Sequence, residues 1–178
     1  MFLFDEDYSS QVRDEVLEII SDSNDEITRQ DAELKAQSLI ETYLNNRYDL
    51  RKIFLDVLAW NNSATYNADN LIHHEGKTYY ALQASTGATP GSAPEHWQLG
   101  DKRNKHIISI TIDIVLYKLY TSNNTRAIPS HVERNYDDAL SWLEKVSAGK
   151  IGPNLPLLPK DTGNPVKAGS EPKQSHYW

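Results

Sequence analysis

Residues 71–82 read LIHHEGKTYYAL and predict a β-hairpin in a chain that is otherwise largely helical. Two runs of strand-forming residues, 71–73 and 78–82, lie on either side of Glu75-Gly76-Lys77. Glycine adopts the positive φ that a tight hairpin turn requires. The hairpin belongs to residues 61–101, which we interpret as a small aromatic β-unit. The helical regions on either side are therefore predicted to be one domain that this insertion interrupts.

Two helices are predicted before the insertion. The first begins at Ser9 or Ser10, ends in the polar stretch 21–24, and has apolar residues at helical spacing: Val12, Val16, Ile19 and Ile20. The second begins near Thr28, and its apolar stripe consists of Ala32, Ala36, Leu39, Ile40, Tyr43 and Leu44. A further short amphipathic piece is expected to end by Trp60.

Two more helices are predicted after the insertion. The third begins at Ile107, and it is apolar around so much of its circumference that we expect it to be buried on most sides. The fourth begins at Pro129 or Ser130, and Gly149 is well placed to end it as a C-cap.

The expected fold class is mainly α, a small four-helix bundle with an inserted β-unit and an extended C-terminal arm. The helical domain is discontinuous and consists of residues 1–60 and 102–151. From residue 152 the chain carries five prolines among Gly, Lys and Asn, a composition that cannot form a core. Residues 152–178 are therefore predicted to be an extended or disordered arm.

Composition excludes several classes of protein. The chain has no cysteine, which rules out disulfides and thiolate chemistry. Its start does not resemble a signal peptide, and its longest apolar run, residues 107–119, is interrupted by polar residues. The net charge of −7 argues against tight nucleic-acid binding.

The charge is unevenly distributed along the chain. Residues 1–60 contain 14 acidic and 6 basic side chains, whereas residues 102–178 contain 7 and 11. An acidic beginning and a basic end would suit copies that pack head to tail, because opposite potentials then meet at each contact. Solvated faces with accidental asymmetry are an equally good interpretation.

Sequence motifs for catalysis are absent: there is no phosphate-binding glycine loop, metalloprotease motif, nucleophile motif or calcium loop. His73 and His74 are adjacent, so in a strand they point to opposite faces and cannot readily share a metal ion. Asp137 and Asp138 are expected to be solvated on the polar side of a helix. We therefore expect no enzyme activity, no metal and no cofactor.

Five aromatic residues of the β-unit are the one set with the character of a binding site: Trp60, Tyr66, Tyr79, Tyr80 and Trp97. Flat rings can stack on sugar faces or fill the pocket of a partner protein. The alternative is that the rings form the core of the unit, since so small a unit has little else to bury, and we expect at least half of them to be buried.

The helical halves resemble a family of Mu-like phage proteins that was formerly described as a domain of unknown function. The similarity rests on Asp113–Tyr117, on Val132–Leu143 with Gly149-Lys150 after it, and on Tyr43–Tyr48. It covers about residues 5–60 and 102–158.

Members of this family are taken to be head-to-tail connector, or adaptor, proteins of tailed phages. The resemblance implies a structural protein of the virion, assembled in the cytoplasm of the bacterial host. It further implies a homo-oligomeric ring, normally a dodecamer, that contacts the portal protein and a tail-side stopper or tail completion protein. Genomic DNA would pass through the channel without specific binding, and no membrane would be involved.

The insertion has a resemblance of its own, to chitin-binding-type carbohydrate modules. It rests on Trp60, on residues 64–69 and 76–82, and on Pro90-Gly91 with Trp97. This resemblance implies a glycan-binding adhesion or decoration protein as the alternative function. We favour a role in protein contacts, because an exposed aromatic patch serves these equally well.

The C-terminal arm carries apolar residues suited to docking on a partner. The candidate anchors are Leu155, Leu157, Leu158, Tyr177 and Trp178. Prolines hold such a segment extended, which lowers the entropy lost when it binds along another subunit or the portal.

Overall fold

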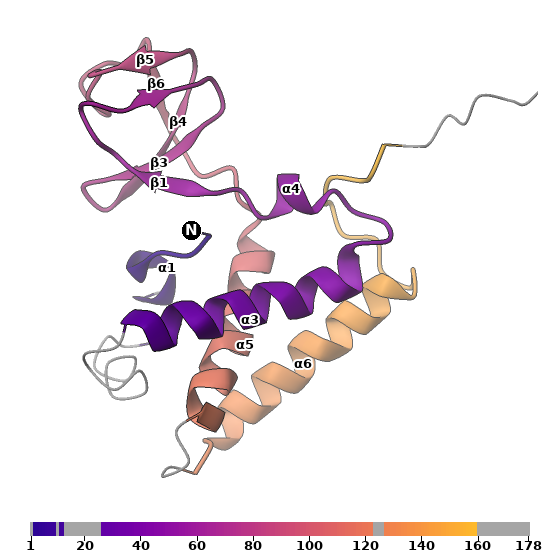
Figure 1. Ribbon diagram of the computed structural model, residues 1–178. Helices are drawn as coiled ribbons and strands as arrows, with labels where there is room; N and C mark the ends of the chain where they lie inside the picture. Colours follow the sequence, from indigo (N-terminus) through magenta and orange to yellow (C-terminus); the bar gives the residue numbers. More distant parts are fainter. Residues whose placement is uncertain (1, 10, 13–25, 123–126, 160–178) are drawn as a thin grey trace, which may run out of the picture.

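The computed structural model describes residues 2–9, 11–12, 26–122 and 127–159 (Figure 1). Three long helices form the helical body: α3 (Glu26–Leu44), α5 (Lys105–Ser122) and α6 (Ser130–Ser147). Two short helices accompany them, α1 (Asp5–Ser9) and α4 (Leu50–Ile53). A β-unit stands at one end of this body, beside α4 (Figure 1).

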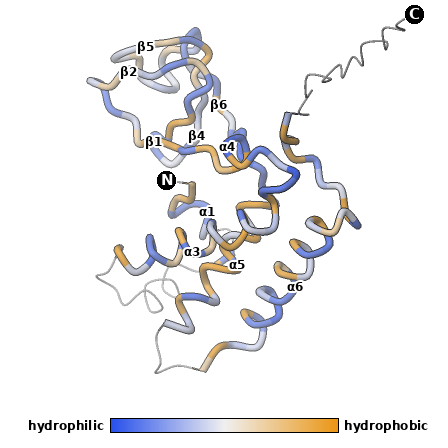
Figure 2. Tube along the Cα trace, turned by 45° about the vertical axis from the view of Figure 1, so that its right-hand side comes forward, coloured by the Kyte–Doolittle hydropathy of each residue, from blue (hydrophilic) through white to orange (hydrophobic). Residues whose placement is uncertain are grey.

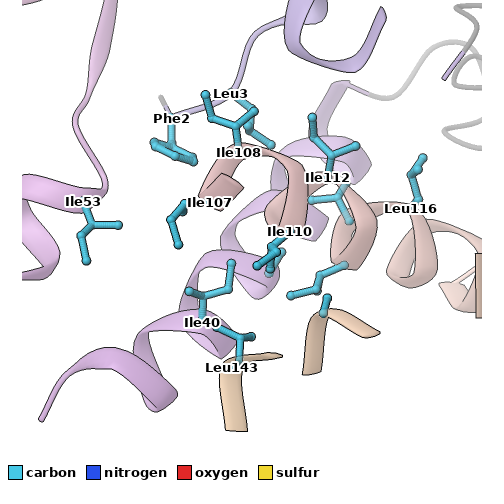
Figure 3. Packing of buried hydrophobic residues seen from close by; sticks show 14 of the residues in the cluster. Phe2, Leu3, Ile40, Ile53, Ile107, Ile108, Ile110, Ile112, Leu116 and Leu143 are labelled. Atoms are coloured by element: carbon cyan, nitrogen blue, oxygen red, sulfur yellow. The ribbon is translucent and has the colours of Figure 1, made fainter. Parts of the chain in front are cut away.

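Helix α5 lies at the centre of the helical body, and nine of its residues are buried. Figure 3 shows its isoleucines packed against Ile40 of α3, Leu143 of α6 and the N-terminal residues Phe2 and Leu3. Burial of this many apolar side chains is the main force that holds the three helices together. The prediction that this helix is buried on most sides is confirmed.

Local sequence sets where α5 and α6 begin and end. Asn104 caps α5, because its Oδ1 accepts hydrogen bonds from the backbone N–H groups of His106 and Ile107 at 3.0 and 3.1 Å. Helix α6 starts directly after Pro129, and it ends before Gly149, whose φ of +70° is the left-handed cap conformation. Both ends of α6 agree with the prediction. In Figure 2 hydrophobic and hydrophilic residues alternate along this helix, as expected for one buried face.

The β-unit contains two small sheets. The larger has the strand order β1-β3-β4-β6, formed by β1 (Val57–Ala59), β3 (Leu71–His74), β4 (Lys77–Ala81) and β6 (Trp97–Leu99). Strands β1 and β3 are parallel, and the other two pairs are antiparallel. The smaller sheet pairs β2 (Thr65–Tyr66) with β5 (Ser85–Thr86).

The predicted hairpin is confirmed as β3 and β4. Its turn consists of Glu75 and Gly76, which both have positive φ, +48° and +70°. This pair of angles is the turn geometry that matches the twist of the two strands.

The prediction of a mainly α four-helix bundle is wrong. In the part of the chain that the structure describes, three long helices pack together and a mixed four-stranded sheet is added to them. The short amphipathic piece that was expected to end by Trp60 is divided: Leu50–Ile53 form α4, whereas Val57–Ala59 form strand β1. Their pairing with Leu71–His73 is a contact that helical periodicity in a short window cannot reveal. Most of the first predicted helix lies outside the described residues, and Ser9 is the last residue of α1.

Candidate functional site

The aromatic residues of the β-unit divide into buried and half-buried rings. Tyr66, Tyr79 and Trp97 are 2, 8 and 3 % exposed and form the core of the unit together with Ile72. The rings of Tyr66 and Trp97 meet edge to face at 5.4 Å. These three rings therefore stabilise the fold and are not available to stack on a ligand, in agreement with the expectation that at least half would be buried.

Trp60 and Tyr80 keep part of their rings exposed, but the structure does not bring them together. Trp60 packs against the core of the unit, and its Nε1–H donates to the carbonyl oxygen of Ala88 at 3.2 Å. Tyr80 follows Tyr79 in β4 and therefore points to the opposite face of the sheet. There the ammonium of Lys102 lies 4.0 Å from the centre of its ring. The five predicted residues thus do not form one flat platform.

The N-terminal segment, residues 2–9, packs on the second face of the sheet at His73. Figures 1 and 2 both place this segment between β1 and the helical body. The ring of Phe4 stacks on that of His73 at 4.6 Å, and Glu6 Oε1 lies 3.1 Å from His73 Nε2. On its other side the ring of Phe2 meets that of Phe54 at 5.1 Å. The segment therefore acts as a wedge that joins the β-unit to the helices.

Arg103 holds this wedge from the point where the chain leaves the β-unit. Its side chain is 2 % exposed and forms ion pairs with Asp7 at 2.7 Å and Asp101 at 2.8 Å, while Nη1 also donates to the carbonyl of Phe2. Burial alone would lower the pKa of Arg103, but the hydrogen bonds to Asp101 and Asp7 raise it. The guanidinium is therefore charged and fully bonded. The sequence analysis did not identify Arg103. A signal for its role is present, because Asp101 and Arg103 carry opposite charges at the edge of the insertion.

A second buried polar contact ties the wedge to α3. The hydroxyl of Tyr8 donates to Glu33 Oε1 at 2.6 Å, and Arg29 lies 3.7 Å from the same carboxylate. Burial raises the pKa of Glu33, although the hydrogen bond from Tyr8 and the charge of Arg29 oppose this. Burial and the adjacent carboxylate also raise the pKa of Tyr8. Arg29 pairs in addition with Asp5 at 2.8 Å.

These contacts account for the acidic run at the N-terminus. Asp5, Glu6 and Asp7 each contact a cationic residue or a histidine of the same chain. These three side chains therefore help to hold the wedge in place.

The arm begins on the surface of its own helical body. Leu155 is 7 % exposed and belongs to the core, so it is not free to anchor a partner. Leu157 pairs with Tyr48, and the backbone N–H of Leu158 donates to the carbonyl of Arg47 at 3.0 Å. The side chains of Leu157 and Leu158 remain 58 and 42 % exposed. The other predicted anchors, Tyr177 and Trp178, lie outside the described residues.

A hollow of about 430 Å³ opens beside α3 and is lined mainly by apolar surface. Phe2 and Leu3 of the wedge form one wall, and Leu34 of α3, which is 67 % exposed, lies at its rim. Thr111 of α5 also reaches it, but its hydroxyl is bonded to the carbonyl of Ile107.

The described residues contain no group of three or more His, Cys, Asp or Glu side chains that could hold a metal ion. His73 and His74 point to opposite faces of the sheet, as expected. Among the helices of the described residues, none is long and apolar enough to cross a membrane.

One family model matches the chain, and its description is Bacteriophage Mu, Gp36. It covers residues 102–171, which contain α5 and α6 and are 70 of the 178 residues. No curated protein and no solved structure matches the chain. The match supports a bacteriophage protein and suggests a structural or morphogenesis role. Residues 5–60 and the insertion lie outside the matched stretch.

Proposed function

We propose that the protein is a head-to-tail connector adaptor of a tailed phage. It is a structural protein without enzyme activity that forms a ring between the portal protein and a tail-side stopper or tail completion protein. The observation that carries this proposal is the match over residues 102–171, because this stretch contains the central helix α5 and its partner α6. The protein then belongs in the virion and assembles in the cytoplasm of the host.

The exposed leucines at the start of the arm support a role in assembly. Leu157 and Leu158 lie side by side in sequence on a segment that two backbone hydrogen bonds hold against residues 47–49. Exposed apolar side chains on a fixed backbone bind partners with a smaller loss of entropy than side chains on a free tail. We infer that they contact the portal or a neighbouring subunit.

The charge of the chain is compatible with a channel for DNA. A net charge of −7 repels the phosphate backbone, so genomic DNA passes without specific binding. The ring is expected to be a dodecamer, as the family resemblance implies, and it requires no membrane.

The test is to express the protein together with the portal protein of the same phage and to examine the product by native mass spectrometry and electron microscopy. We expect a ring seated on one end of the portal. A protein that stays monomeric at every concentration and is not captured by portal rings would contradict the proposal.

The alternative is a glycan-binding decoration protein. The observation in its favour is the partial exposure of Trp60 and Tyr80 on a β-unit that has its own aromatic core. Because these rings lie on opposite faces, any sugar would contact only one of them. A contact between proteins therefore remains the better use of this surface.

A further inference from the structure

A second hollow, of about 370 Å³, lies between α5 and α6 within the stretch that the family model matches. Trp142 and His106 form one end, where their rings meet edge to face at 4.6 Å. Asp113 and Asp138 contribute carboxylates from the two helices, and Ile110 adds apolar surface. The hollow thus combines an indole ring, two carboxylates and apolar surface.

The two carboxylates have little compensation from their own chain. Asp113 accepts a hydrogen bond from the side-chain amide of Asn135 at 3.0 Å. Burial raises the pKa of Asp113, and the adjacent carboxylate of Asp138 adds to this effect, whereas the hydrogen bond from Asn135 and the charge of His106 oppose it. Among the described residues neither carboxylate forms an ion pair with lysine or arginine, and even Arg134, one turn before Asp138, does not reach it. A cation brought from outside would relieve this repulsion.

A guanidinium group suits this lining better than an ammonium. It is planar, it can bind a carboxylate through two parallel N–H donors, and it stacks on the face of an indole. We propose that the hollow receives an arginine side chain from a second copy of the chain. This inference rests on the proposed function, because a ring needs a contact between two different surfaces of neighbouring subunits.

The chain itself presents a suitable arginine. Arg51, on α4, is exposed and forms no ion pair within the described residues, whereas the guanidinium of Arg47 already lies over the ring of Tyr48 at 5.5 Å. Lys52, which follows Arg51, is already paired with Asp49 at 3.8 Å. Copies with a net charge of −7 repel unless surfaces of opposite charge meet, and Arg51 against the hollow is such a meeting.

Paired charge reversal tests the contact directly, with sedimentation velocity as the measurement. D138R makes the hollow repel Arg51, and R51E makes the arginine site repel the hollow. Each variant alone is expected to associate at least about tenfold more weakly than the wild type. Mixed in equal amounts the two variants should recover association, because every contact in an alternating assembly again joins opposite charges. D137R and K150E change the net charge equally at exposed positions outside the hollow, and they should not weaken association.

The proposal is overturned if the wild type does not associate, if the mixture does not recover, or if D137R and K150E weaken association as much as D138R and R51E do. It is also overturned if D138R abolishes capture by portal rings while self-association is unchanged, which would assign the hollow to the portal. The proposed function fails separately, if the wild type associates through this contact but the portal does not capture it.

Discussion

Arg103 and Asp7 form an ion pair at 2.7 Å across 96 residues of sequence. Asp7 belongs to the N-terminal wedge, and Arg103 follows the last strand of the β-unit. The pair therefore joins the wedge to the segment between the β-unit and α5, and the wedge contacts α3 separately through Tyr8. The β-unit is an insertion in sequence, but the structure attaches it firmly to the helical body.

Replacing Arg103 by methionine is expected to destabilise the protein by about 3–5 kcal/mol, because Asp7 and Asp101 would lose their charged partner in a largely buried site. Urea denaturation measures the loss. Lys102→Met is the matched control: its ion pair with Asp69 is exposed, so its loss should cost only about 0–1 kcal/mol. Equal effects of the two substitutions would contradict the role assigned to Arg103.

The limits of the insertion can be tested by deletion. Replacing residues 57–100 with a short Gly-Ser linker removes both sheets and keeps Asp101 for Arg103, so helical circular dichroism and a cooperative melt should survive. Replacing residues 61–101 should be worse, because it leaves Val57–Ala59 unpaired and removes Asp101. If neither protein keeps its helical signal, the helical body does not fold without the β-unit.

Glu33 should make stability depend on pH. Burial raises its pKa above the ordinary value of 4.5, so the folded chain binds this proton more tightly than the unfolded chain does. This contribution is complete below pH 4.5 and is lost as the pH rises through the folded-state pKa. The stability of Glu33→Gln relative to wild type should therefore increase as the pH rises from about 4 to about 7. If the free energy of unfolding, measured by urea denaturation, changes with pH in the same way in the wild type and in Glu33→Gln, the prediction is contradicted. Asp31→Asn, at an exposed position, is the control.

Sugar binding by the β-unit requires a substitution that leaves the fold intact. Trp97→Ala is unsuitable, because this ring is 3 % exposed and its removal should cost about 3–5 kcal/mol. Trp60→Ala and Tyr80→Ala remove the half-buried rings instead. We expect a glycan array that includes chitin to show no saturable binding to the wild type. Saturable binding that Trp60→Ala abolishes in a folded protein would instead favour the glycan-binding alternative.

Two truncations separate the stability of the arm from its docking. A chain that stops at Gly152 loses Leu155 from the core, which should cost about 1.5–3 kcal/mol and lower the melting temperature. A chain that stops at Pro159 keeps Leu155 and both backbone hydrogen bonds to residues 47–49, so it should melt like the full chain. It also lacks Tyr177 and Trp178, and we expect weaker capture by portal rings. Unchanged capture would remove the docking role of residues 160–178.

The sequence alone was sufficient where neighbouring residues set the geometry. The Glu75-Gly76 turn, the start of α6 after Pro129 and its end before Gly149 depend on backbone angles and on hydrogen bonds within a few residues. The burial of α5 was also predictable, because an apolar surface on nearly all sides of a helix leaves no solvated orientation.

Contacts between distant residues were decided by the tertiary structure. Val57–Ala59 became a strand because β3 offered free hydrogen-bonding groups, and a sequence window does not contain that partner. Arg103 forms an ion pair with the distant Asp7, and Leu155 packs in the core of the helical body. The aromatic residues show the same limit: their order indicated a β-unit, but only the direction of each side chain separated the buried Trp97 from the half-exposed Trp60. Burial depends on which faces the folded chain brings together, and no local pattern of residues determines that arrangement.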